Sequence, residues 1–243
     1  GFVESGGVQT DIFTITFSSV VLGEYTFTLL EELDHLSVQG NNDQVFSLPV
    51  IAVDQDNTDS VMKPLSVTIT DDVPVITNMT ATSTLVVDED DLGSVVSQAT
   101  GAFVTTEGAD QVEVYELRNI SALEATLTSG TEAISITEVA GAANITTYQG
   151  TTTSGTPIFT LALANDGSYT FGLLGPLNHP TSPNSNTLTI PFDVVAVDGD
   201  GDDSNQYELP IEVLDDVPLM AAPTGETVVD EDDLIGIGSD QSE

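Results

Sequence analysis

Residues 187–218 read TLTIPFDVVAVDGDGDDSNQYELPIEVLDDVP, and this stretch decides the fold. It opens with alternating and β-branched residues, a pattern that is typical of a buried or half-buried strand. An acidic segment with two glycines follows, and a second apolar run, YELPIEV, leads away from it. Because glycine permits a tight reversal of the backbone, the stretch predicts two antiparallel strands joined by an acidic hairpin loop.

The same pattern occurs earlier in the chain. VVAVDGDGDDS at 194–204 shares seven of 11 positions with VIAVDQDNTDS at 50–60, and LDDVP at 214–218 aligns with TDDVP at 70–74. Upstream, GSYTFGLLGPLNHP shares eight of 14 positions with GEYTFTLLEELDHL, and all three offsets are 144 residues. The acidic block VVDEDDL occurs twice, with an offset of 142 residues. Recurrence at one period is the signature of tandem structural units.

The repeat divides the chain into three parts. Residues 1–74 are the C-terminal half of one unit, 75–218 form a complete unit, and 219–243 begin a third. Segments such as QVEVYEL, AISITEV and PIFTLAL show strand patterns separated by turn residues, and SALEATL at 121–127 is the only candidate for a short helix. We therefore predict an all-β protein built from tandem antiparallel β-sandwich units.

The charge of the chain limits its partners. It has 40 Asp and Glu residues against Lys63 and Arg118, which gives a formal net charge of −38. Nucleic acid is excluded as a partner because phosphate binding needs Lys and Arg. No apolar run approaches the roughly 20 residues of a membrane helix, so we expect no membrane insertion. Self-repulsion at this charge density favours binding of a hard divalent cation, which takes oxygen ligands.

The sequence contains no recognisable catalytic motif. There is no cysteine, no G-x-S-x-G nucleophile segment and no phosphate-binding loop. Carboxylate pairs are so frequent that they cannot indicate a glycosidase. His35 and His179 occupy the same position in the repeat, and we interpret them as structural turn residues. We therefore predict that the protein is not an enzyme.

Three groups of acids are candidate calcium ligands. The hairpin loop and its earlier copy place carboxylates at alternate positions, DDVP closes each unit, and DEDD follows its opening segment. About 13 extended residues separate Pro74 from Asp88 and span roughly 43 Å, so DEDD should lie at the far end of the complete unit. We expect one cluster at the near joint (Asp71, Asp72, Asp198, Asp200, Asp202), a second at the far end (Asp88, Glu89, Asp90, Asp91, Asp215, Asp216), and a weaker site in the earlier loop (Asp54, Asp56, Asp59).

In combination, these motifs resemble a known family. The runs DGSYTFGLLGPLNHP, TLTIPFDVVAVDGDGDD, LDDVP and VVDEDDL are similar to the tandem repeat of about 143 residues in giant type I-secreted RTX adhesins. The resemblance covers most of 75–234 and the half-unit. It implies immunoglobulin- or cadherin-like sandwiches, calcium at the joints, and an extracellular stalk on a bacterial cell surface. The earlier loop departs from the pattern, because VDQDNTD lacks two glycines and one acid.

Two functions follow as expectations. The first is a calcium-rigidified repeat of an adhesin stalk or fibre that functions in cell adhesion and biofilms, with adjacent repeats or neighbouring copies in a fibre as partners. The alternative is an adhesin domain that recognises a glycan or protein on a host or biofilm surface. The close match between the units favours the first, and a unit with a large inserted loop or an aromatic pocket would favour the second.

Overall fold

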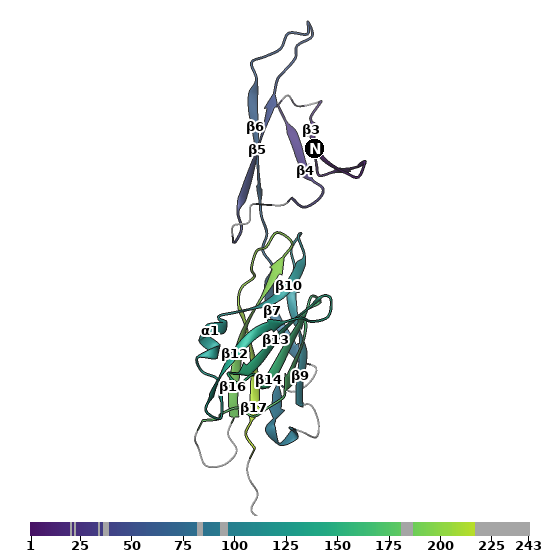
Figure 1. Ribbon diagram of the computed structural model, residues 1–243. Helices are drawn as coiled ribbons and strands as arrows, with labels where there is room; N and C mark the ends of the chain where they lie inside the picture. The colour runs from purple at the N-terminus through teal and green to yellow at the C-terminus, as the bar shows by residue number, and fades with distance from the viewer. Residues whose placement is uncertain are drawn as a thin grey trace, which may run out of the picture.

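The structure of the 243-residue chain is a computed structural model. It describes residues 1–19, 21, 23–33, 35, 39–81, 85–92, 97–180 and 187–216. The predicted start of a third unit at 219–243, including the second VVDEDDL block, lies outside these residues. Within them the chain is all-β, which confirms the predicted fold class. Two bodies lie end to end, with the N-terminal half-unit above the complete unit in Figure 1.

The complete unit consists of two sheets. One has seven strands in the order β11-β12-β13-β14-β15-β9-β7, and the other has four in the order β10-β16-β17-β8. The elements are β7 (Val75–Ala81), β8 (Val86–Asp88), the 3-10 helix η1 (Glu89–Asp91), β9 (Ser97–Thr106), β10 (Val112–Arg118), α1 (Ile120–Glu124), β11 (Thr128–Ser129), β12 (Glu132–Val139), β13 (Ile145–Thr152), β14 (Pro157–Ala164), β15 (Ser168–Leu173), β16 (Thr187–Asp198) and β17 (Tyr207–Leu214).

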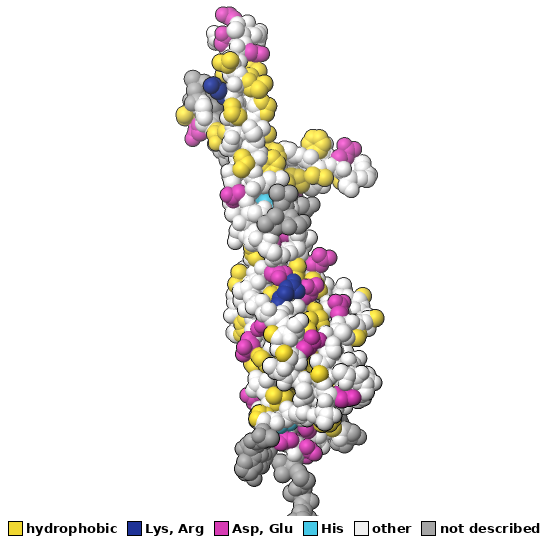
Figure 2. All heavy atoms as spheres, turned by 60° about the vertical axis from the view of Figure 1, so that its left-hand side comes forward, with side chains coloured by type: hydrophobic (Ala, Val, Ile, Leu, Met, Phe, Trp, Pro, Cys, Tyr) yellow, Lys and Arg dark blue, Asp and Glu magenta, His cyan; other side chains and the backbone are white. Residues whose placement is uncertain are grey.

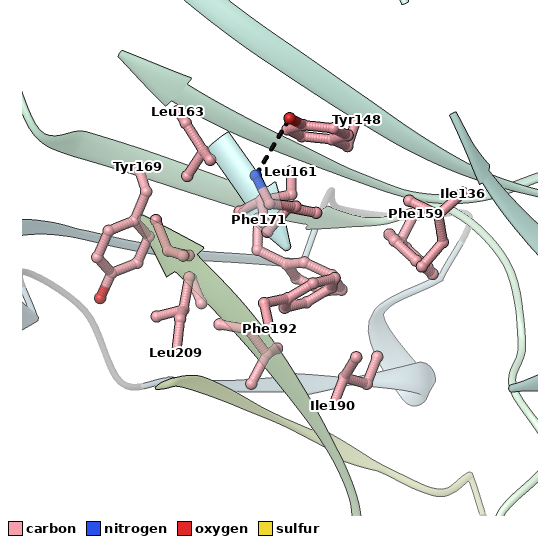
Figure 3. Packing of buried hydrophobic residues seen from close by; sticks show 14 of the residues in the cluster. Ile136, Tyr148, Phe159, Leu161, Leu163, Tyr169, Phe171, Ile190, Phe192 and Leu209 are labelled. Carbon is pink, nitrogen blue, oxygen red and sulfur yellow. Dashed lines mark hydrogen bonds between the residues drawn. The ribbon is translucent and has the colours of Figure 1, made fainter. Parts of the chain in front are cut away.

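The core lies between these two sheets. Phe159 and Phe171 from the larger sheet meet Phe192 from the smaller one, with ring centroids 5.8 and 5.9 Å from that of Phe192. All three side chains are fully buried, and Figure 3 shows them interleaved with the surrounding aliphatic residues. Tyr148 contributes a polar contact, because its hydroxyl accepts a hydrogen bond from Leu117 N at 3.1 Å. Alternation of apolar and polar residues along the strands thus fills the space between the sheets.

Two of the three strand pairs of the N-terminal body reproduce the second half of this unit. The pairs are β1 (Phe2–Ser5) with β2 (Val8–Asp11), β3 (Phe13–Phe17) with β4 (Tyr25–Leu29), and β5 (Asp43–Val50) with β6 (Lys63–Thr70). At the repeat offset, the pairs β3-β4 and β5-β6 correspond to β14-β15 and β16-β17, whereas the pair β1-β2 has no counterpart there. Its described residues contain no equivalents of β7 to β12, and most of the large hydrophobic side chains that are exposed in the described parts of the chain lie here.

One strand pair differs from the antiparallel prediction. The segment from Val75 to Asp88 reads as one extended run, but the structure divides it into β7 and β8, which belong to different sheets. The strand β8 pairs with β17 in parallel, with Leu214 opposite Asp88. The pair is parallel because both strands run from the near end of the unit towards its far end. The pairing therefore places the residues that follow β8 beside those that follow β17.

The short helix α1 overlaps the predicted segment SALEATL and confirms that prediction. No helix in the described ranges is long and apolar enough to cross a membrane.

Candidate metal centres at the ends of the complete unit

The acidic loop between β16 and β17 is a closed turn. An isolated bridge joins Val197 to Asp203. Inside it, Asp198 Oδ1 accepts hydrogen bonds from the backbone nitrogens of Asp202 (2.7 Å) and Gly201 (3.1 Å). Gly201 has a φ of 99°, which disfavours any residue with a β-carbon. These bonds turn the loop so that one oxygen each of Asp198, Asp200 and Asp202 lies within 4.8 Å of the others.

The earlier loop has the same backbone but a poorer set of ligands. Val53 bridges Asp59, and Thr58 N donates to Asp54 Oδ1 at 2.9 Å, as in the later copy. Thr58 stands where the complete unit has Asp202, and this removes one carboxylate. Asp54, Asp56 and Asp59 are all exposed, and they belong to none of the compact acidic groups in the described part of the chain.

At the near end, the loop meets the C-terminal end of the half-unit. Asp71 lies close to Asp200, and a second group joins Asp71 with Asp72 and Asp110, in each case with ligand atoms within 4.8 Å of one another. Asp71 is buried, with its side chain fully shielded from solvent. The structure thus brings together Asp71 and Asp72 from one unit and three loop acids from the next. Asp110, in the turn between β9 and β10, joins them.

Direct hydrogen bonds connect the two units at this joint. The amide of Gln39 donates to Gly201 O at 2.8 Å and accepts from Asp203 N at 2.9 Å. Asp72 Oδ2 accepts from Ala109 N at 2.7 Å. The neighbouring Gly108 has a φ of 79°, and a β-carbon there would overlap the Asp72 carboxylate. Glycine at this position therefore allows the two units to approach closely.

The joint contains more negative charge than its surroundings neutralise. Arg118 donates to both oxygens of Asp203, at 2.6 and 2.8 Å, and also pairs with Glu116. In the described residues, both oxygens of Asp200 and Oδ2 of Asp202 are buried and have no hydrogen-bond partner. Such buried carboxylate oxygens are costly unless a cation is bound.

The same environment raises the pKa of three carboxyls at the joint. Burial, followed by the close approach of the Asp200 carboxylate, raises the pKa of Asp198 to about 7 from an ordinary value of 3.8. Burial and the charge of Asp200 also raise the pKa of Asp71 and that of Asp110. At neutral pH the joint therefore resists full ionisation unless a cation balances the carboxylates.

At the far end, Glu89 and Asp215 lie close together, and His179 completes the group, with ligand atoms within 4.8 Å of one another. The parallel pairing of β8 with β17 produces this arrangement. Glu89 Oε1 lies 3.1 Å from His179 Nε2 and accepts a hydrogen bond from Leu177 N at 2.7 Å.

The other predicted residues at this end are placed differently. Asp88 caps η1, where its Oδ1 accepts from Asp90 N at 3.0 Å. Asp90, Asp91 and Asp216 are exposed and belong to no compact group of ligand atoms in the described segments. Of the six acids expected at the far end, the structure therefore brings Glu89 and Asp215 together.

Sequence reasoning did not include His35, His179, Asp110 or Gln39 among the site residues. Both histidines have a signal in the repeat, since they are 144 residues apart, but that signal by itself favours a structural turn residue. In the structure each lies in a group with two carboxylates, and histidine atoms are visible near the joint and at the lower end of the molecule in Figure 2. Asp110 and Gln39 have no matching residue elsewhere in the chain, so the repeat could not reveal them.

No family model, no curated protein and no solved structure matches this chain.

Proposed function

We propose that the chain is a calcium-rigidified repeat of an extracellular bacterial adhesin stalk or fibre. One observation carries the proposal: carboxylates from two successive units converge at the near joint and leave buried oxygens without partners among the described residues. Calcium takes six to eight oxygen ligands at about 2.3–2.6 Å and tolerates irregular geometry, so this set fits calcium. Asp71, Asp72, Asp110, Asp198, Asp200 and Asp202 would hold the ion or ions.

Calcium would act on the joint by changing the sign of the interactions there. Without a cation, the clustered carboxylates repel one another across the boundary between the units. With a cation, ligands from both units share one charge, and the relative orientation of the units becomes fixed. Extracellular calcium-binding modules typically have dissociation constants of about 10⁻⁴–10⁻³ M, a range that suits a rigid stalk outside the cell.

A melting experiment tests calcium binding. At a calcium concentration 100-fold above the dissociation constant, one site stabilises the folded state by about 2.7 kcal/mol. For a protein of this size that corresponds to a rise in Tm of about 5–10 °C. We expect this rise in calcium relative to excess EGTA, and a much smaller one in magnesium. Equal Tm values in calcium and EGTA would contradict the proposal.

A distance measurement tests rigidity at the joint. The chain has no cysteine, so spin labels can be attached to a Ser66→Cys/Thr137→Cys variant, whose two sites are exposed on β6 and β12. We expect a narrow distance distribution in calcium and a broad one in EGTA. Asp202→Asn should broaden the distribution in calcium, whereas Glu138→Gln, an exposed change on β12, should leave it narrow. A distribution that does not depend on calcium would refute the stalk function even if calcium binds.

A further inference from the structure

The histidine-containing groups differ in chemistry from the calcium loop. The loop offers only oxygens, whereas each of two further groups adds one imidazole nitrogen to two carboxylates: His179 with Glu89 and Asp215, and His35 with Asp71 and Asp200. Calcium is bound by oxygen ligands, while imidazole suits zinc, copper, iron and nickel. We propose that the ends of the units carry a second type of metal site, which binds a borderline divalent cation such as Zn²⁺.

The geometry of the far-end group supports this proposal. His179 Nε2 lies 3.1 Å from Glu89 Oε1, and each side chain is 3% exposed. Two ligands that are each about 2.0–2.1 Å from zinc at a tetrahedral angle lie about 3.3 Å apart. The observed spacing therefore requires only a small adjustment to accept the ion, with Asp215 as a third ligand and water available for the fourth position.

The near joint repeats the arrangement. His35 and Asp71 are 36 residues apart, as are His179 and Asp215. His35 Nδ1 lies 3.2 Å from Asp71 Oδ1, and the two side chains are 4% and 0% exposed. Two separate parts of the chain thus bury an imidazole next to carboxylates at the same point of the repeat.

The hydrogen bonding of the rings distinguishes a metal ligand from a structural turn histidine. A structural histidine usually donates from one ring nitrogen and accepts at the other. In the described residues, neither nitrogen of His35 has a hydrogen-bond partner, although Nδ1 is at ion-pair distance from Asp71. Within the same residues, His179 contacts Glu89 through Nε2, and its Nδ1 lacks a partner. At the near joint a metal would use a lone pair of His35 that the protein leaves unsatisfied, whereas at the far end it would take the place of the hydrogen between His179 Nε2 and Glu89 Oε1.

Titration of the full chain with Zn²⁺ in calcium-free buffer tests the proposal, because the near-joint group shares Asp71 and Asp200 with the proposed calcium ligands. Calorimetry should show two zinc sites in the wild type, one in His179→Gln and none in the His35→Gln/His179→Gln variant. Glu138→Gln is the matched control and should bind like the wild type. Zinc binding that is the same in the double variant would reflect surface carboxylates and would overturn the proposal.

A second readout does not depend on the variants folding. The chain has two histidines, so ¹⁵N-labelled imidazoles give two sets of ring signals, and substoichiometric Zn²⁺ should shift a nitrogen signal in each. Rings that are unaffected by zinc would overturn the proposal. The calcium melt and the zinc titration fail independently: loss of the calcium effect would refute the stalk function and leave the zinc sites standing, and the reverse also holds.

Discussion

Substitution of Asp198 by asparagine should have opposite effects on stability with and without calcium. Asp198 is 2% exposed, and the pKa of its carboxyl in the folded state is about 7 against an ordinary 3.8. At 1.36 kcal/mol per pKa unit, ionising this group in the metal-free fold costs about 4 kcal/mol at pH 8. An asparagine side chain avoids the charge, and its amide oxygen can still accept from Asp202 N. In EGTA, the variant should be more stable than the wild type by about 1–4 kcal/mol.

The pH dependence has a defined sign. Because the pKa of Asp198 is higher in the folded state than in the unfolded state, the folded state holds the proton more tightly. The free energy of unfolding of the metal-free wild type should therefore fall as the pH rises from about 4 to about 7. The variant lacks this contribution, so without metal its free energy of unfolding should exceed that of the wild type by most at pH 8 and by less at pH 5.5. In calcium at pH 8, loss of a ligand should make the variant less stable than the wild type.

Urea unfolding followed by far-ultraviolet circular dichroism measures these differences. The four conditions are calcium or EGTA, at pH 8 or pH 5.5, with Glu138→Gln as the control for the loss of one negative charge. The reasoning is refuted if Asp198→Asn destabilises the protein equally in calcium and in EGTA at pH 8. That outcome would mean that the carboxylate serves only as a hydrogen-bond acceptor within the loop.

Three further substitutions probe other parts of the structure. Phe171→Ala should lower the free energy of unfolding by about 3–5 kcal/mol, with or without calcium, because it opens a cavity beside Phe159 and Phe192. A loss below about 1 kcal/mol would contradict the core packing. Arg118→Gln should lower the free energy of unfolding by roughly 1 kcal/mol and weaken calcium binding in calorimetry, since the side chain holds Asp203 at the end of the loop. An unchanged calcium affinity would show that this ion pair does not position the loop. Gly108→Ala should broaden the distance distribution between spin labels on the two units, because a β-carbon overlaps the Asp72 carboxylate; an unchanged distribution would show that the contact is dispensable.

The sequence alone was sufficient for the fold class and for the near-end loop. Strand periodicity is a local property, because alternate residues of a strand point to opposite faces, and the repeat showed each pattern twice. The structure shows the consequence in the two loops, where Val53 pairs with Asp59 as Val197 pairs with Asp203. The alternation of acids with glycine in DGDGD was also enough to predict that one short turn gathers its carboxylates.

Only the tertiary structure decided which acids share a site. Glu89 and Asp215 meet because β8 leaves the sheet of β7 and pairs in parallel with β17, a long-range pairing that no local pattern encodes. Asp110 reaches the joint through the turn between β9 and β10, and the chain holds no second copy of that turn to mark it as special. The histidines have a repeat signal, but burial next to carboxylates, which makes them candidate ligands, depends on segments far apart in the sequence. Sequence spacing determines which groups lie on one strand or turn, whereas packing between strands determines which carboxylates and imidazoles lose water together.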